Sequence, residues 1–144
     1  MKPETEPVAP DEWLIRLVWE DRVTDGVPVI SPNAFEPRKN ETDGISFFRR
    51  DCLNEPSDAL FVIPEEKRSR YAIVLIPVSQ LASLNLSVQP AKIDTVPGHV
   101  VVPEINITDY RANKARFTPI KLRLAEAASD HIMRRPGNPP AAHA

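Results

Sequence analysis

Four segments of the chain carry patterns of apolar residues that predict β-strands. Residues 13–19 read WLIRLVW, and both the odd-numbered and the even-numbered positions are apolar except at Arg16. Because successive side chains of a strand point to opposite faces, such a segment is typical of an interior strand that is covered on both sides. Residues 45–49, 71–76 and 99–102 predict three further strands, the last resuming after residue 103 through residue 107.

A helical spacing of apolar residues marks the end of the chain. Thr118 fits the N-cap position and Pro119 the first helical position, where the missing N–H of proline has no consequence. The apolar stripe of this helix consists of Phe117, Ile120, Leu124, Ala127, Ala128 and Ile132. Arg134 and Arg135 then fall in the last turn, and Pro136 ends the helix.

The order of these elements predicts an α+β fold. We expect a mixed or mainly antiparallel sheet with the C-terminal amphipathic helix packed on it, rather than alternating βαβ units. A length of 144 residues suits one domain. Both ends are rich in proline and poor in large apolar residues, so residues 1–11 and 136–144 are predicted to be disordered tails around a domain at residues 12–135. Short helices are predicted at residues 57–61 and 80–84, and an edge strand at residues 86–88.

Composition and charge narrow the range of functions. The formal net charge of −2 gives no long-range attraction to nucleic acid, so we expect no nucleic-acid partner, and the basic residues around Lys121 are interpreted as a solvated helix face. The N-terminus lacks the apolar run of a signal peptide, and no apolar stretch approaches the ~20 residues of a membrane-spanning helix. We therefore expect a cytoplasmic protein without membrane contact. A single cysteine, Cys52, and the widely spaced His99, His131 and His143 predict no metal site.

Three polar residues stand in predicted strands, and each has two interpretations. A buried guanidinium has to be paired, so Arg16 either forms an ion pair with a nearby acid or holds an anionic ligand in a cleft. Ser46 either bonds to the backbone or orients a ligand, and His99 is either satisfied by a neighbour or serves as a general acid or base. The sequence motifs of nucleotide-binding loops, serine hydrolases and zinc proteases are absent, so no cofactor is expected.

One arrangement of short motifs resembles a known group of proteins. The order L-x-R at residues 14–16, S-x-x-A-F at residues 31–35, I-S-x-x-R at residues 45–49 and then His99 is similar to that of small uncharacterised bacterial proteins. The likeness spans about residues 13–102, and no activity is attached to that group. The resemblance implies that Arg16, Ser31, Phe35, Ser46, Arg49 and His99 belong to one region, with Ser31 and Arg49 as ligand-binding residues.

Two functions are compatible with these observations. The first is a non-catalytic protein-interaction or accessory module, which the missing motifs and the proline-bounded loops favour. The alternative is a small transferase or hydrolase that acts on a phosphate- or nucleotide-bearing substrate. In it, Arg16 holds an anion, Ser46 orients it, and His99 or Glu104 moves a proton. The order of Arg16, Ser46 and Glu104 is similar to the arrangement in ADP-ribosyltransferases.

Overall fold

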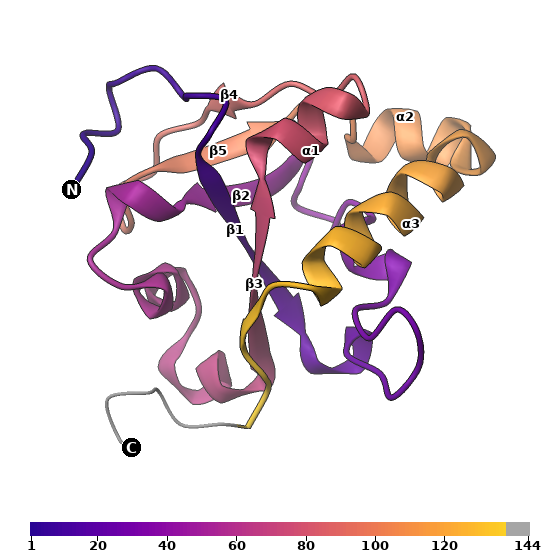
Figure 1. Cartoon of the computed structure of the whole chain (residues 1–144), viewed down its shortest axis with the longest axis horizontal. Helices are drawn as coiled ribbons and strands as arrows, with labels where there is room; N and C mark the ends of the chain where they lie inside the picture. The colour runs from indigo at the N-terminus through magenta and orange to yellow at the C-terminus, as the bar shows by residue number, and fades with distance from the viewer. Residues whose placement is uncertain (138–144) are drawn as a thin grey trace.

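The computed structural model describes residues 1–137 and contains an antiparallel sheet with helices (Figure 1). Within these residues the six-stranded sheet has the order β4-β5-β2-β1-β3-β6, and every neighbouring pair is antiparallel. The strands are β1 (Trp13–Trp19), β2 (Ile45–Arg49), β3 (Tyr71–Pro77), β4 (Gln89–Pro90), β5 (His99–Val102) and β6 (Ile132–Arg134). The predicted α+β fold class is confirmed. Part of the predicted C-terminal tail, residues 138–144, lies outside the described residues.

Strand β1 is an interior strand, as its two apolar faces predict. It lies between β2 and β3 and pairs with β3 along its whole length. Leu14 and Val18 belong to the apolar core on one face of the sheet, whereas Ile15 and Leu17 belong to a second core on the opposite face. Each face therefore needs its own covering layer.

The helices are distributed unequally between the two faces. The first core is covered by α1 (Val78–Ser83), α2 (Ile107–Ala112) and α3 (Lys114–Ser129), together with the 3₁₀ helix η2 (Pro32–Phe35). The second core is covered by η4 (Pro56–Val62), by Leu53, which directly follows η3 (Arg50–Cys52), and by the loop before β5. Two further 3₁₀ helices are η1 (Glu20–Arg22) and η5 (Glu65–Arg70). The second face thus carries 3₁₀ turns and loops where the first carries α-helices (Figure 1).

The predicted limits of the last helix were wrong at both ends. Helix α3 begins at Lys114, with Asn113 as its N-cap residue, so Pro119 lies inside the helix. Proline is tolerated there because the carbonyl that loses its N–H partner belongs to Ala115, which is exposed and accessible to water. The helix ends at Ser129, and the next residues form strand β6 on the edge of the sheet.

The predictions for three shorter elements also differ from the structure. The short edge strand forms at β4 and not at residues 86–88, and the chain after β5 leads into α2 without a resumed strand. The helix expected at residues 57–61 is η4, a 3₁₀ helix capped by Glu55. Proline at position 56 explains the earlier start, since its fixed backbone geometry suits the first helical position.

Candidate functional site

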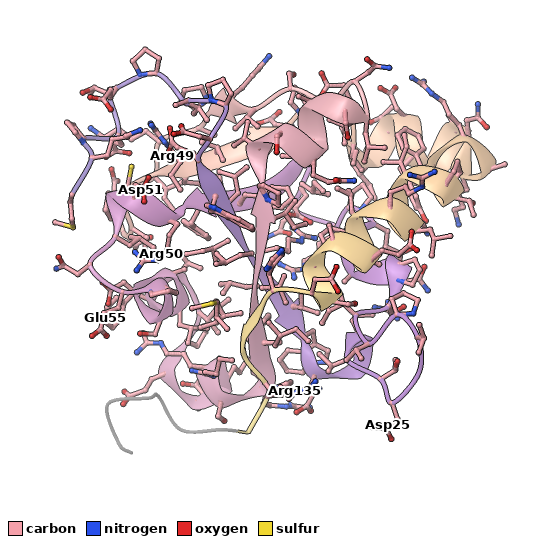
Figure 2. All side chains as sticks on the ribbon, viewed as in Figure 1. Asp25, Arg49, Arg50, Asp51, Glu55 and Arg135 are labelled. Atoms are coloured by element: carbon pink, nitrogen blue, oxygen red, sulfur yellow. The ribbon has the colours of Figure 1, made fainter. Side chains whose placement is uncertain are left out.

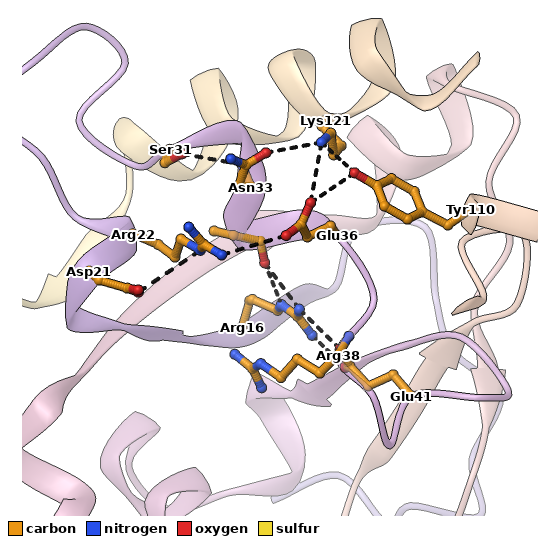
Figure 3. A network of polar contacts seen from close by, with 11 residues as sticks. Arg16, Asp21, Arg22, Ser31, Asn33, Glu36, Arg38, Glu41, Tyr110 and Lys121 are labelled. Atoms are coloured by element: carbon orange, nitrogen blue, oxygen red, sulfur yellow. Dashed lines mark hydrogen bonds and ion pairs between the residues drawn. The ribbon is translucent and has the colours of Figure 1, made fainter. Parts of the chain in front are cut away.

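A buried ion pair occupies the point where strands β1 and β2 separate. The backbone ladder between the two strands ends at Ile15 and Phe48. Arg16 is the next residue of β1, and its Nη1 lies 2.7 Å from Oε2 of Glu41 in the loop before β2 (Figure 3). Both side chains are almost fully buried, at 1% and 4% exposure.

The side chains of Arg16, Arg38 and Glu41 replace the missing part of the β1–β2 ladder. Glu41 Oε2 accepts a hydrogen bond from the backbone N–H of Ser46 at 2.6 Å, and Arg16 Nη1 donates to the carbonyl of Ser46 at 3.0 Å. On the facing strand, Arg38 Nη2 donates to the carbonyl of Leu17 at 2.6 Å. Buried backbone groups are costly when unpaired, so these three side chains stabilise the open end of the strand pair.

Arg16 has no hydrogen-bond donor left for a ligand. Besides Glu41 and Ser46, its guanidinium contacts the carbonyl of Ala34 through Nε at 3.2 Å and Nη2 at 3.0 Å. All five of its N–H groups are used within the protein. Burial raises the pKa of the Glu41 carboxyl, but the charge and hydrogen bonds of Arg16 outweigh this effect and hold the pKa below its ordinary value. The geometry is that of a structural ion pair.

Arg49, which the resemblance marks as a ligand-binding residue, is also surrounded by protein atoms. Its Nε and Nη2 donate to the two carboxylate oxygens of Glu12 at 2.9 and 2.8 Å. Its other N–H groups contact the backbone carbonyls of Glu4, Glu6 and Pro7 at 3.3, 2.6 and 3.3 Å. Figure 2 shows Arg49 beside the N-terminal segment that supplies these carbonyls.

The same contacts hold residues 1–11 against the end of the sheet. The N–H of Lys2 donates to the carbonyl of Asp51 at 2.7 Å, and the N–H of Gly98 donates to the carboxylate of Glu4 at 3.2 Å. The sequence predicts disorder for this segment because it contains few apolar residues. Composition could not indicate these contacts, since the groups that bind Arg49 are mainly backbone carbonyls, which every residue has.

A second polar cluster joins helix α3 to the loop that carries Arg38 and Glu41. Lys121 Nζ donates to Tyr110 Oη at 2.7 Å and to the side-chain oxygen of Asn33 at 3.0 Å, and it lies 3.6 Å from Glu36 Oε2 (Figure 3). Tyr110 in turn donates to Glu36 at 2.8 Å. The interpretation of Lys121 as part of a solvated face was therefore wrong, because the side chain is buried among polar partners. Ser31 accepts the N–H of Asn33 at 3.2 Å as the N-cap of η2.

Two of the predicted site residues share one pocket. Ser46 and His99 line a cavity of about 220 Å³ on the second face of the sheet. The other lining residues are Leu17, Arg38, Asn40, Glu41, Phe48, Val62, Ile63 and Ile93. His99 Nδ1 lies 2.6 Å from the carbonyl of Ala91. Because a carbonyl can only accept, Nδ1 carries the proton, and in the neutral ring Nε2 is an acceptor.

The structure does not bring Arg16, Ser46 and Glu104 together. Arg16 starts from the face of the sheet that carries α3, whereas the side chain of Ser46 faces the pocket on the opposite side. Glu104 is half-buried and accepts hydrogen bonds from the N–H and hydroxyl of Ser87 at 2.9 and 2.6 Å. The arrangement considered for an ADP-ribosyltransferase is therefore not formed by these three residues.

A separate pocket lies beside an exposed aromatic ring. Phe61 of η4 is 58% exposed, and it borders a cavity of about 360 Å³. We call this region the Phe61 surface, and it is formed by Met1, Cys52, Leu53, Asn54, Asp58, Phe61, Thr95, Val96 and Pro97. Arg68 stacks on the ring of Phe61 at 5.1 Å and donates from Nε to the carbonyl of Ile63 at 2.8 Å. The ring is therefore held in place while most of it stays accessible.

Comparisons with known proteins identify no relative, so the function has to be inferred from the geometry of the sites. No protein-family model, curated protein or solved structure matches this chain. Within residues 1–137, no helix combines the length and the apolar composition needed to cross a bilayer. The same residues contain no group of three or more His, Cys, Asp and Glu side chains placed to hold a metal ion.

Proposed function

We propose that this chain is a non-catalytic protein-interaction module whose partner docks on the Phe61 surface. The observation that carries the proposal is the aromatic ring of Phe61, 58% exposed and fixed by Arg68 at the mouth of a cavity of about 360 Å³. Exposed apolar groups around a hollow are typical of protein-binding sites, and aromatic residues dominate their binding energies.

The position of Met1 extends the apolar part of this surface. Its side chain is 81% exposed and borders the same cavity as Phe61. Leu53, Val96 and Pro97 are further apolar residues of the cavity wall. A ring whose position Arg68 already restrains loses less conformational entropy on association than a free one. The occupant that fits is a protein segment that inserts one aliphatic or aromatic side chain between Phe61 and these walls.

The polar side of the cavity indicates what flanks that apolar side chain. Asn54 and Asp58 line the cavity next to Phe61. The Asp58 carboxylate accepts the N–H of Glu55 at 3.2 Å, and it retains further acceptor capacity. A partner segment with a hydrogen-bond donor or a basic residue beside its apolar anchor would satisfy these groups.

The arginines on strands β1 and β2 have no donor free for a substrate, which supports a non-catalytic role. Arg16 and Arg49 each use all five N–H groups within the protein. Cys52 lies in the wall of the Phe61 surface, but burial raises the pKa of its thiol, which disfavours the nucleophilic thiolate. The proposal includes a bacterial, cytoplasmic setting, with which a single buried free thiol is compatible.

A selection from a displayed random-peptide library tests this function. The baits are the wild-type protein, Phe61→Asp, and the matched control Leu122→Asp, which places the same charge on an exposed residue of α3. We expect the wild type and Leu122→Asp to enrich one peptide family with a shared apolar anchor, and Phe61→Asp to lose it. A family that Phe61→Asp retains, or no enriched family on the wild type, would contradict the proposal.

A further inference from the structure

Arg38 is an arginine whose donors are largely unused in the structure. Its guanidinium makes one hydrogen bond, from Nη2 to the carbonyl of Leu17 at 2.6 Å, and within residues 1–137 it forms no ion pair. A guanidinium has five N–H groups, so four remain for other partners. The neighbouring Arg16 has none left.

The surroundings of Arg38 carry an excess of positive charge. Two guanidinium groups, of Arg16 and Arg38, lie near one carboxylate, that of Glu41. Burial, and then repulsion by Arg16, lower the pKa of Arg38 to about 10, so it remains charged at neutral pH. The carboxylate of Glu36 on the adjoining side is engaged by Tyr110 and Lys121. One unit of positive charge is therefore left without a counter-ion.

The pocket beside Arg38 offers further groups that can bind an anion. Arg38, Asn40 and Ser46 line the same cavity of about 220 Å³. Asn40 lies on an exposed loop and can donate from its amide, and the hydroxyl of Ser46 makes no hydrogen bond within the described residues. The Glu41 carboxylate also borders the pocket, but Arg16 neutralises it and both of its oxygens accept backbone N–H groups.

Size and lining of the pocket determine which anion fits. A cavity of about 220 Å³ is smaller than the ~300 Å³ that begins the usual range of ligand sites, so the ligand has few atoms. Half of the lining residues are apolar, namely Leu17, Phe48, Val62, Ile63 and Ile93. A single excess charge matches a monoanion, and the planar fork of a guanidinium matches a carboxylate.

We propose that this pocket binds a small organic carboxylate with a short aliphatic tail. The carboxylate lies against the free N–H groups of Arg38 and the side chains of Asn40 and Ser46, and the tail lies against Phe48 and Ile93. The site is separate from the Phe61 surface, because the two cavities have no lining residue in common. This inference therefore does not depend on the proposed interaction function.

Titration with acetate, butyrate and inorganic phosphate, followed by amide chemical shifts of the labelled protein, tests this site. Butyrate is expected to bind about fifteenfold tighter than acetate, because it has two more methylenes and each buried methylene adds about fourfold in affinity. Its shifts are expected at Asn40, Ser46 and His99. Inorganic phosphate is expected to bind more weakly than butyrate. Equal affinities for acetate and butyrate, or tighter binding of phosphate, would overturn the assignment.

Two variants leave the fold intact and change only the pocket. Asn40→Asp places a negative charge beside Arg38 and is expected to weaken butyrate binding by about tenfold or more. Its matched control is Asn54→Asp, the same change at an exposed residue of the other cavity, which should leave butyrate affinity unchanged. Ser46→Ala removes a hydroxyl that the protein does not use and should cost about tenfold. Equal losses in Asn40→Asp and Asn54→Asp would show that only general charge matters and would refute the site.

Discussion

Arg16 and Glu41 are 25 residues apart in sequence, yet their side chains form a buried ion pair with a 2.7 Å contact between Nη1 and Oε2. The pair lies at the end of the β1–β2 ladder and binds both backbone polar groups of Ser46. An arginine that looks like a ligand-binding group in the sequence is thus a structural replacement for strand pairing. Its contribution to stability can be measured.

Removing one member of this pair is expected to cost more than removing both charges. Arg16→Met leaves the Glu41 carboxylate buried without its counter-charge and should lower the free energy of unfolding by about 3–5 kcal/mol. In the double variant Arg16→Met, Glu41→Gln both charges of the pair are removed, and the glutamine oxygen can still accept the N–H of Ser46. Urea unfolding of the single and double variants measures the coupling. Additive losses would show that the two side chains do not depend on each other.

The pH dependence of stability follows from two depressed carboxyl pKa values. Burial raises the pKa of Glu41 and Glu12, but Arg16 and Arg49 respectively outweigh it, so both pKa values lie below the ordinary value of 4.5. As the pH falls, the carboxyls of Glu41 and Glu12 are therefore protonated in the unfolded chain before they are protonated in the folded protein. The stabilisation is complete at neutral pH and is lost as the pH drops below about 4.5 through the folded-state pKa values.

Variants at the two carboxylates separate this effect from general acid unfolding. Glu41→Gln and Glu12→Gln should each be less stable than the wild type at neutral pH and show a smaller further loss between about pH 5 and about pH 3. Urea midpoints across this interval provide the measurement. If the urea midpoints of both variants fall with pH as steeply as that of the wild type, other groups cause the acid sensitivity.

Gly98 is predicted to be intolerant of a side chain. Its φ of +82° lies in the left-handed region, and an added Cβ would lie 2.7 Å from Cβ of Cys52. Gly98→Ala should therefore lose about 1–3 kcal/mol or more of stability. Gly137→Ala is the matched control, because Gly137 has a similar φ of +80° with no atom within 4 Å of the added Cβ. Equal melting temperatures for the two variants would show that the contact with Cys52 is easily relieved.

The thiol of Cys52 is expected to react slowly in the folded protein. Burial raises its pKa despite the nearby charge of Arg49, and the side chain is shielded within the wall of the Phe61 surface. Reaction with a chromogenic disulfide at neutral pH should be roughly tenfold or more slower than in urea-unfolded protein. A bound partner peptide should slow it further. Reaction at the unfolded rate would mean that this wall is open in solution.

The fold was predictable where the apolar pattern of a single segment is enough to identify its element. The WLIRLVW segment predicts an interior strand because both faces are apolar, and β1 is that strand. The predicted start of α3 was too late. Proline favours the first turn of a helix, but Pro119 lies further along, on the exposed face of α3, where it is tolerated. Edge strand β6 has no distinct pattern, since it is only three residues long and two of them pair with β3.

The candidate sites were less predictable because their residues come from loops. The role of Arg16 depends on Glu41, and that of Arg38 on the carbonyl of Leu17, at sequence separations that no periodic pattern encodes. The resemblance alone placed Ser46 and His99 in one region. Their shared pocket depends on the pairing of β2 with β5, and the sequence does not give the strand order. The exposure of Phe61 could not be predicted, because an apolar residue in a short helix is usually turned inward.

The affinity of a selected peptide for Phe61→Ala is the most direct test of the proposed interaction surface. Calorimetric titration of the peptide enriched on the wild-type protein should give a dissociation constant about 30-fold weaker for Phe61→Ala, as expected for an aromatic residue worth ~2 kcal/mol. Leu122→Ala, which shortens an exposed side chain on α3, should bind like the wild type. Unchanged affinity in Phe61→Ala, or an equal loss in both variants, would contradict the account.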